Sequence, residues 1–275
     1  MTDYICPLCQ TPLSAVDRSL RCCNNHCFDI AKEGYVNLLP VQYKHSKDPG
    51  DNKAMVNARR AFLDKGFYQP LADRITALYR EKFPANKEAF LLDAGCGEGF
   101  YTHQHKCADN NVYGVDIAKN AVRIAAKRYK ECSFSVGTLA KLAFADQQFD
   151  WLYSIYAPVL EQEFYRVLKP GGFLLTVTPA KKHLLELKSL IYQEAKLHDS
   201  ERNPIEHMPV ILEERLSYVM NFNQGQDIVN LLAMTPFAFK AGVEVVEKLR
   251  DLSEFSCQAD FLIRLYQKTE KSSAP

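Results

Sequence analysis

The sequence predicts an α/β fold, with a Rossmann-like, doubly wound sheet preceded by a small zinc-binding module. The apolar residues 90–92 are typical of a buried strand, and a Gly-x-Gly-x-Gly turn and a plausible helix start follow them. Residues 112–117 form a second candidate strand. It ends in an acid about 20 residues beyond the turn, the spacing at which an acid reaches a ribose hydroxyl in such folds. Five of the nine cysteines fall in the first 27 residues, which favours a bound metal over disulfides.

Length and composition fit a globular protein with one large domain and a small appendage. The chain has 275 residues, of which 47% are hydrophobic and 24% charged. Its apolar runs are far shorter than the ~18 residues of a transmembrane helix. The first residues lack the basic and apolar regions of a signal peptide, so we expect a cytoplasmic protein without a membrane segment. Because the net charge is +1, any binding to nucleic acid must depend on local basic patches.

The glycine turn indicates which nucleotide-like ligand the fold binds. A dinucleotide fingerprint, G-x-G-x-x-G, would need its third glycine at position 100, which is Phe100. Here the third glycine is Gly99, and Asp93 stands two residues before the first. A carboxylate at this position would repel a pyrophosphate, but it suits S-adenosylmethionine, which carries an ammonium and a sulfonium. The Asp-x-Gly-x-Gly-x-Gly pattern resembles motif I of the class I methyltransferases, which implies a class I (Rossmann-like) S-adenosylmethionine-dependent methyltransferase domain.

A turn that merely reverses the chain is the alternative interpretation of this glycine pattern. The second candidate strand argues against it, because that strand ends in Asp116 at the separation expected of a nucleoside site. Two neighbouring strand ends with acids therefore favour a bound nucleoside.

The N-terminal cysteines have the spacing of a zinc site. Cys6-Pro-Leu-Cys9 is a C-x-x-C pair, and Cys22-x-x-x-His26 supplies a second pair. Tetrahedral Zn²⁺ takes four such N/S ligands, and a stretch of about 40 residues hardly folds without a staple of this kind. Cys23-x-x-x-Cys27 has the same spacing as the second pair, so the spacing alone leaves these two cysteines open as ligands.

The remaining elements follow from hydrophobic periodicity and breaker residues. In chain order we expect helices at residues 52–63, 70–83, 119–129 and 161–168, and strands at 132–136, 149–155 and 173–178, the last after a Lys-Pro-Gly-Gly breaker. We assign residues 1–40 to the zinc-binding module, 41–60 to a linker and first helix, and 61–275 to the methyltransferase domain.

Long blocks along nearly the whole chain resemble the bacterial 23S rRNA (guanine-N1)-methyltransferases of the RlmA type. These blocks are Cys-Pro-Leu-Cys from Cys6, Phe-Asp-Ile-Ala-Lys-Glu-Gly-Tyr-Val-Asn-Leu-Leu-Pro from Phe28, Ala-Arg-Arg-Ala-Phe-Leu-Asp from Ala58, Gly-Cys-Gly-Glu-Gly from Gly95, and Met-Thr-Pro-Phe-Ala from Met234. The resemblance implies methylation of guanine N1 in a 23S rRNA hairpin, with S-adenosylmethionine as donor and one structural zinc.

The resemblance also implies roles for particular residues. The zinc ligands are Cys6, Cys9, Cys22 and His26, and Cys23 and Cys27 depart from the family pattern. The cofactor residues are Tyr68, Asp93, Gly95, Gly97, Glu98, Asp116 and His183. Tyr156 and Pro158 follow the strand at 149–155, at the sheet edge where the target base is expected, and are the candidates for binding the base. The sequence identifies no catalytic base for the N1 proton, and it leaves a homodimer open.

The resemblance favours the guanine-745 type of the family, with the neighbouring guanine-748 type as an alternative. A small-molecule methyltransferase would share the catalytic domain but has no need of the zinc module. A zinc-ribbon scaffold without catalysis would leave the glycine turn without a role. We expect the module to grip RNA, together with basic residues of the connector, which are Lys44, Lys47, Arg59 and Arg60.

Overall fold

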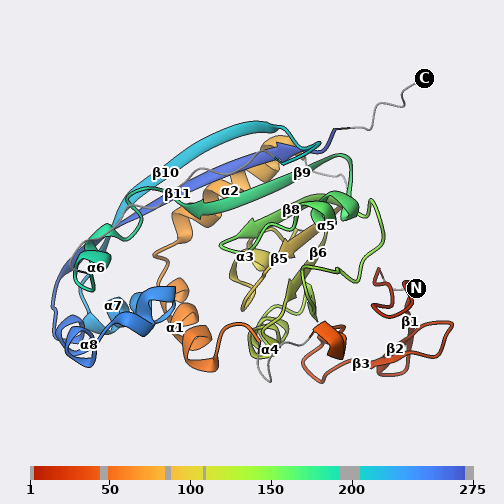
Figure 1. Ribbon diagram of the computed structural model, residues 1–275, viewed down its shortest axis with the longest axis horizontal. Helices are drawn as coiled ribbons and strands as arrows, with labels where there is room; N and C mark the ends of the chain where they lie inside the picture. Colours follow the sequence, from red (N-terminus) through yellow and green to blue (C-terminus); the bar gives the residue numbers. More distant parts are fainter. Residues whose placement is uncertain (1–2, 44–48, 84–87, 108–109, 193–204, 270–275) are drawn as a thin grey trace.

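The computed structural model describes residues 3–43, 49–83, 88–107, 110–192 and 205–269. An eight-stranded sheet in the order β10-β11-β9-β8-β5-β6-β7-β4 runs through the molecule (Figure 1). Its strands are β4 (Val36–Asn37), β5 (Ala89–Ala94), β6 (Asn110–Asp116), β7 (Ser133–Val136), β8 (Phe149–Ile155), β9 (Leu168–Pro179), β10 (Val210–Phe222) and β11 (Phe255–Gln267). This arrangement confirms the predicted α/β fold.

The parallel half of the sheet positions the predicted site. From β7 to β9 the order is that of a Rossmann-like sheet whose first strand is β5, so β6 and β8 lie on either side of β5. These strands are buried on both faces, which explains their nearly continuous apolar sequences. The carboxyl ends of β5, β6 and β8 meet at one edge, and ligands of open α/β sheets bind at such a switch point.

The helices cover both faces of this sheet. They are α1 (Lys53–Asp64), α2 (Gln69–Lys82), α3 (Phe100–Gln104), α4 (Lys119–Arg128), α5 (Glu161–Val167), α6 (Leu185–Ser189), α7 (Gly225–Ala233) and α8 (Val243–Arg250), with short 3₁₀ turns η1 (Val41–Tyr43) and η2 (Pro236–Lys240). Leu91 packs into the cluster shared with α1, α2, α4 and α7, whereas its neighbour Leu92 packs into the cluster shared with α5. Among the described residues, no helix is long and apolar enough to cross a membrane.

The breaker at residues 169–172 becomes a bulge inside β9. Leu168 pairs with Phe149, but the next pair of this ladder joins Trp151 to Phe173, so four residues leave the ladder. Gly171 has φ +74° at this excursion, a conformation that glycine adopts without strain. The strand predicted at 173–178 therefore forms, with one further residue of β9 before the bulge.

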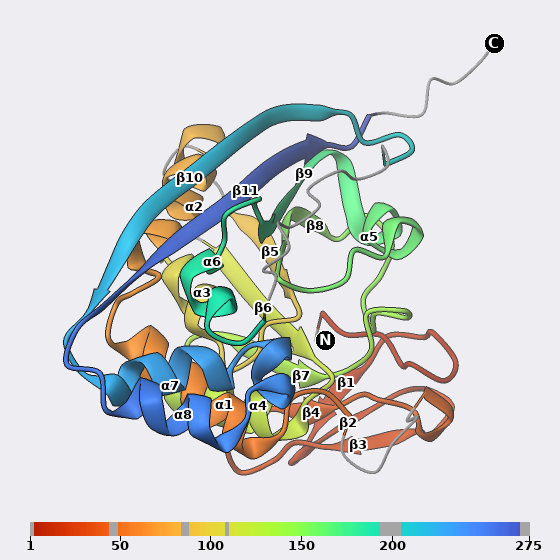
Figure 2. The ribbon, with the colours of Figure 1, turned by 60° about the vertical axis from the view of Figure 1, so that its left-hand side comes forward.

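The long hairpin of β10 and β11 extends the sheet beyond β9. Both strand pairs, β9 with β11 and β10 with β11, are antiparallel. Helices α7 and α8 lie in the connection between the two strands, and α7 packs against α1 (Figure 2). The connection between the two strands therefore places α7 against α1, with α8 packed on α7.

The N-terminal module is continuous with the large sheet. Its own sheet consists of β1 (Ser14–Val16), β2 (Ser19–Arg21) and β3 (Cys27–Asp29). Next in the chain, β4 pairs in parallel with β7, and the Ile5 N–H donates to the Ala143 carbonyl at 2.9 Å. Tyr4 stacks on Phe144 with a ring-centre distance of 5.1 Å. The boundary drawn at residue 40 thus lies just beyond a strand that belongs to the main sheet.

Candidate cofactor site and zinc cluster

The glycine turn after β5 has the tight geometry that its sequence predicts. Gly95, Gly97 and Gly99 have φ values of +90°, +54° and +85°. A Cβ on Gly95 would lie 2.4 Å from the Cβ of Ala157, and one on Gly99 would lie 3.0 Å from that of Ala125. A side chain at Gly95 would therefore collide with the segment just after β8, and one at Gly99 would crowd α4. The glycines therefore let the turn sit closely between its neighbours and present its backbone to a ligand.

Asp116, at the end of β6, fastens this turn. Its Oδ2 accepts a hydrogen bond from the Gly97 N–H at 2.9 Å, and its Oδ1 accepts one from the Ala118 N–H at 2.8 Å. The carboxylate thus bridges the glycine turn and the start of α4. Each oxygen keeps a further lone pair that can accept a ribose hydroxyl.

Two more acids, one at the end of β5 and one within the turn, have little access to water. Asp93 is 2% exposed and Glu98 is 3% exposed. Burial raises the pKa of Asp93 to about 8, although the Thr102 hydroxyl donates a hydrogen bond to its Oδ2 at 2.6 Å. Burial also raises the pKa of Glu98 to about 7, an effect that the positive charge of Arg59 opposes. Such a group of acids fits a cationic ligand, because a nearby positive charge favours the ionised carboxylates.

Arg59 projects from α1 toward this turn. Its Nη1 lies 2.5 Å from Oδ2 of Asp51 and 3.7 Å from the position that a Cβ of Gly97 would occupy. It was expected among the RNA-binding residues of the connector. The structure instead places it beside the predicted cofactor residues. Its neighbour Arg60 is exposed, and Lys44 and Lys47 lie outside the described residues.

Tyr68, Tyr156 and His183 come together although they are far apart in the sequence. Nδ1 of His183 accepts a hydrogen bond from the backbone N–H of Asp260 at 3.1 Å, so a neutral His183 carries its proton on Nε2. Nε2 lies 3.1 Å from the Tyr156 hydroxyl oxygen and 3.4 Å from that of Tyr68. The Nε2–H therefore donates to Tyr156, the closer of the two, and the Tyr156 O–H is oriented to donate elsewhere.

Tyr156 stands at the mouth of the site. Its backbone has φ +57°, which is uncommon for a residue with a side chain and is found at functional sites. The residue is 45% exposed, in contrast to the buried strand before it, and Pro158 is exposed as well. Ala157 between them touches Gly95 of the glycine turn. The two residues expected to bind the base therefore lie beside the predicted cofactor site.

Asp260 of β11 holds this group in place, and the sequence analysis missed it. Its buried carboxylate accepts hydrogen bonds from Arg215 Nε at 2.6 Å and from the Lys182 N–H at 2.8 Å. Burial by itself raises the pKa of Asp260, but these hydrogen bonds outweigh it and hold the pKa below its ordinary value. The sequence does show an acid within the apolar run of residues 259–263, which is unusual for a buried strand. Its partner Arg215 on β10 cannot be identified without the register between the two strands.

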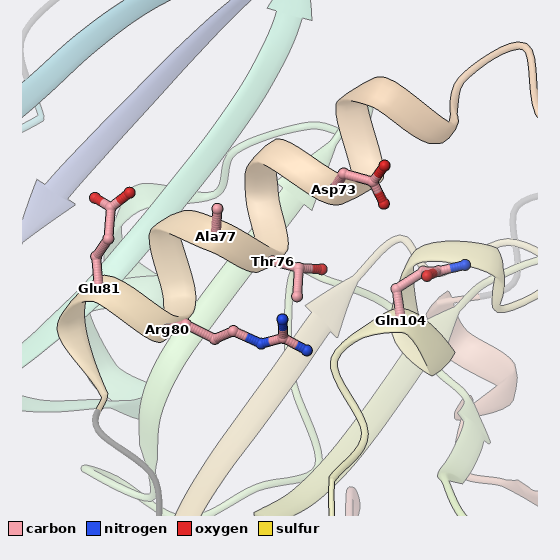
Figure 3. Close-up of a pocket in the computed structure, with 6 residues that line it drawn as sticks. All are labelled: Asp73, Thr76, Ala77, Arg80, Glu81 and Gln104. Atoms are coloured by element: carbon pink, nitrogen blue, oxygen red, sulfur yellow. The ribbon is translucent and has the colours of Figure 1, made fainter.

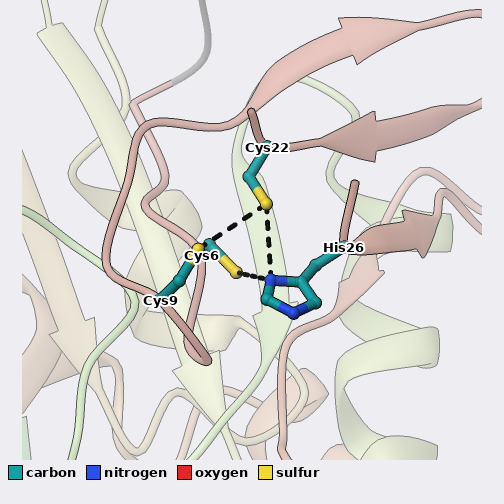
Figure 4. Close-up of side chains that lie close together, drawn as sticks. All are labelled: Cys6, Cys9, Cys22 and His26. Atoms are coloured by element: carbon teal, nitrogen blue, oxygen red, sulfur yellow. Dashed lines mark hydrogen bonds between the residues drawn. The ribbon is translucent and has the colours of Figure 1, made fainter. Parts of the chain in front are cut away.

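The N-terminal cluster has the geometry of a four-ligand metal site (Figure 4). Nδ1 of His26 lies 3.4 Å from the Sγ atoms of both Cys6 and Cys22, and the Sγ atoms of Cys9 and Cys22 are 3.6 Å apart. The four donor atoms all lie within 4.8 Å of one another. Zn–S bonds of about 2.3 Å and Zn–N bonds of about 2.0 Å give tetrahedral edges of roughly 3.5–3.8 Å, and the three short separations of 3.4, 3.4 and 3.6 Å lie close to these values.

Two similar turns build this cluster. Gln10 and Asn25 have φ values of +61° and +62°, and each follows shortly after the first cysteine of a ligand pair. The Gln10 N–H donates to the Cys6 carbonyl, and the Asn25 N–H donates to the Cys22 carbonyl. Cys23 and Cys27 are exposed and lie outside the cluster. The predicted set of four ligands is therefore the set that the fold brings together.

A surface groove on the outer side of α2 and α3 is not part of either site. Its lining residues are Asp73, Thr76, Ala77, Arg80, Glu81 and Gln104 (Figure 3). It contains none of the cysteines or predicted cofactor residues.

Two family models match the chain. The first, described as "RlmA, N-terminal", a zinc ribbon, matches residues 4–47, and the second, "Methyltransferase domain", matches residues 92–176. These ranges contain the cysteine cluster and the glycine turn, respectively.

Three relatives share much of the sequence. "Putative 23S rRNA (guanine-N(1)-)-methyltransferase YxjB" of Bacillus subtilis is 31% identical, over 94% of this chain and 96% of the relative. "23S rRNA (guanine(748)-N(1))-methyltransferase" of Streptomyces fradiae is 38% identical, over 66% of this chain and 65% of the relative. "Putative 23S rRNA (guanine-N(1)-)-methyltransferase" of Micromonospora griseorubida is 35% identical, over 66% and 67%.

Proposed function

Since this chain belongs to the family of 23S rRNA (guanine-N1)-methyltransferases, we propose that it methylates N1 of a guanine in a 23S rRNA hairpin. The observation that carries this proposal is the exposed Tyr156 beside a glycine turn lined with acids. A binding place for a base thus adjoins a binding place for a cationic nucleoside. The same chain also carries the zinc ribbon, which a small-molecule methyltransferase does not need.

Residues of the glycine turn bind the cofactor in this proposal. S-adenosylmethionine supplies an electrophilic methyl group on its sulfonium. Asp116 accepts hydrogen bonds from the ribose hydroxyls, and Asp93 accepts the ammonium. The turn from Gly95 through Gly97 to Glu98 contacts the ligand with its backbone, while Tyr68 and His183 line the side of the site that faces the base.

Tyr156 orients the guanine through its hydroxyl. Its exposed side chain and the exposed Pro158 line the entry at which the edge of the unpaired base approaches. Its hydroxyl, which accepts the Nε2–H of His183, donates its own proton to O6 of the base. As N1 gives up its proton to solvent water, negative charge shifts onto O6, and a donor placed there stabilises that charge in the transition state.

The zinc module and the connector hold the RNA. Arg18, Arg21 and Arg60 are exposed basic side chains near the module and on α1. Binding through several phosphates requires that the affinity for RNA fall with salt, by roughly 0.7 to 0.9 log units per decade of salt for each phosphate neutralised.

We propose guanine 745 as the target, in accordance with the resemblance found in the sequence. Guanine 748 is the second candidate, because the relative from Streptomyces fradiae is named for that position. A methyl group on N1 blocks base pairing, so reverse transcription of 23S rRNA stops next to the modified base. Comparing rRNA from cells with and without this protein should show one stop that depends on the protein, at guanine 745. A dependent stop at guanine 748 would replace the first candidate with the second, and no dependent stop would contradict the proposed function.

A further inference from the structure

Arg59 covers the glycine turn from the side of α1. Val56 packs with Ala118 and Ala121 of α4, which seats α1 next to the end of β6. Arg59 lies three residues after Val56 and hence on the same side of the helix. Its Nη1 stands 3.7 Å from where a Cβ of Gly97 would be. A side chain with five N–H donors is thus aimed at the backbone of the turn.

The segment before α1 fixes the direction of this side chain. Asp51 forms an ion pair with Arg59, in which its Oδ2 lies 2.5 Å from Nη1 of the arginine. Gly50 has φ +85°, and a Cβ there would lie 2.9 Å from the Cβ of Ala118. This close packing holds Asp51 near the end of β6. Asp51 pairs with Nη1 of the guanidinium, and within the described part of the chain its other donors have no side-chain partner, which leaves them for a ligand.

Two further groups at the turn complement this positive charge. The Tyr101 hydroxyl, in the first turn of α3, is buried and has no hydrogen-bond partner among the described residues. A buried hydroxyl without a partner is costly, so a ligand atom that pairs with it is stabilising. Asp93, at the end of β5, supplies a buried acid on the same turn. A guanidinium, a carboxyl group and a hydroxyl without a partner among the described residues thus surround one turn. Together they match the carboxylate and the ammonium of a zwitterionic α-amino acid.

We propose that Arg59 and the Tyr101 hydroxyl bind the α-carboxylate of the methionine part of S-adenosylmethionine. Asp93 binds the ammonium of the same group, and Asp116 binds the ribose. This inference rests on the proposed function and moves Arg59 from the RNA-binding residues to the cofactor site. The charge of Arg59 also opposes the rise in pKa that burial imposes on Tyr101 and Glu98, as expected for a cation close to the turn.

Two ligands that differ in the amino-acid part test this assignment by binding alone. S-adenosylhomocysteine carries the α-carboxylate and the ammonium, whereas 5′-methylthioadenosine has the same nucleoside without them. Isothermal titration calorimetry would measure the affinity of both ligands for the full-length protein and for Arg59→Gln, Tyr101→Phe and Arg60→Gln. The last variant removes the neighbouring exposed arginine and serves as the matched control.

Arg59→Gln should weaken S-adenosylhomocysteine about ten- to a hundredfold, the range for losing a charge-assisted hydrogen bond. Tyr101→Phe should weaken it several-fold. Both variants should bind 5′-methylthioadenosine within about twofold of the unmodified protein, which also shows that the nucleoside site is folded. Arg60→Gln should leave both affinities unchanged.

Equal loss of both ligands in Arg59→Gln would mean that Arg59 only supports the turn, and would overturn the assignment. Unchanged binding of S-adenosylhomocysteine would overturn it as well. If the unmodified protein bound neither ligand, the proposed function itself would be contradicted, and the assignment with it.

Discussion

Asp93 is a carboxyl group that the fold keeps protonated until a cation arrives. Its burial raises its pKa to about 8, whereas in the unfolded chain it ionises near its ordinary range. The unliganded fold therefore binds more protons than the unfolded chain between these values. By linkage, the burial of Asp93 lowers the stability of the unliganded protein progressively as the pH rises toward about 8. An ammonium beside the carboxylate reverses this preference.

Binding of S-adenosylhomocysteine should consequently release protons near neutral pH. Because the ligand's ammonium favours ionised Asp93, the affinity should rise as the pH increases from about 6 to about 7.5, below the pKa of about 8 in the free protein. Calorimetry in two buffers with different ionisation enthalpies measures the protons released. The nucleoside 5′-methylthioadenosine, which lacks the ammonium, should show a much flatter dependence. Net proton uptake with S-adenosylhomocysteine would contradict the role of Asp93.

The Tyr156 hydroxyl can be separated from its ring by substitution. Tyr156→Phe keeps the exposed ring and removes the donor to O6, so kcat for RNA methylation should fall roughly 10²-fold, the lower end for losing one oxyanion donor. The affinity for S-adenosylhomocysteine should change little. Tyr165→Phe, on α5, is the control because α5 packs into the cluster on the opposite face of the sheet. An unchanged kcat in Tyr156→Phe would rule out this role of the hydroxyl.

At the scale of elements, two glycines differ in how strictly their surroundings require glycine: Gly95 in the glycine turn and Gly171 in the bulge of β9. Gly95 and Gly171 both have positive φ, at +90° and +74°, but only a Cβ on Gly95 collides with a neighbour. Gly171→Ala should therefore cost about 1–2 kcal/mol of unfolding free energy, the strain of a left-handed residue. Gly95→Ala adds the clash with Ala157, so it should cost more and weaken cofactor binding strongly. Denaturant unfolding and ligand titration of both variants provide the comparison, and equal effects would show that the clash relaxes without consequence.

The parallel strands and their strand-end acids were predictable because local sequence determines them. β8 was predicted at its observed bounds, residues 149–155, and β5 and β6 within a few residues of theirs, since apolar runs ended by acids or glycines are strong signals. The four zinc ligands followed from spacing together with the family resemblance. The contacts of His183 and Asp260 were not predictable, because they depend on the antiparallel register between β9, β10 and β11. The position of Arg59 beside the glycine turn was not predictable either, because the packing of α1 on α4 cannot be derived from charge.

At the scale of the whole molecule, the zinc module and the methyltransferase domain share a core. Tyr4 and Leu13 of the module belong to the same cluster as Leu92, Tyr113 and Phe144 of the larger domain. Removal of residues 1–40, the range assigned to the module from the sequence, would take β4 from the sheet and uncover this cluster. Loss of a single zinc ligand is therefore the better perturbation.

Cys22→Ser should lower the zinc content from about one equivalent to near zero, because structural zinc needs all four ligands. Since the cores are shared, it should also lower the unfolding temperature of the whole chain by roughly 5–10 °C, the shift for about 2–3 kcal/mol in a protein of this size. Metal analysis and calorimetry measure both quantities. Cys23→Ser, the exposed neighbour outside the cluster, should behave like the unmodified protein. A separate early transition for the module, with the main transition unchanged, would show that the two parts unfold independently.

Methyl transfer to guanine N1 in rRNA is the reaction on which the proposed roles of all these residues depend. It is tested most directly by incubating the purified protein with S-adenosylmethionine and an unmodified 23S rRNA hairpin, and analysing the digested RNA by mass spectrometry. We expect the unmodified protein to form one 1-methylguanosine per hairpin. Asp116→Ala, which lacks the carboxylate proposed to bind the ribose hydroxyls, should form none. A hairpin that stays unmethylated while the protein binds S-adenosylhomocysteine, or a methyl group on another atom of the base, would contradict it.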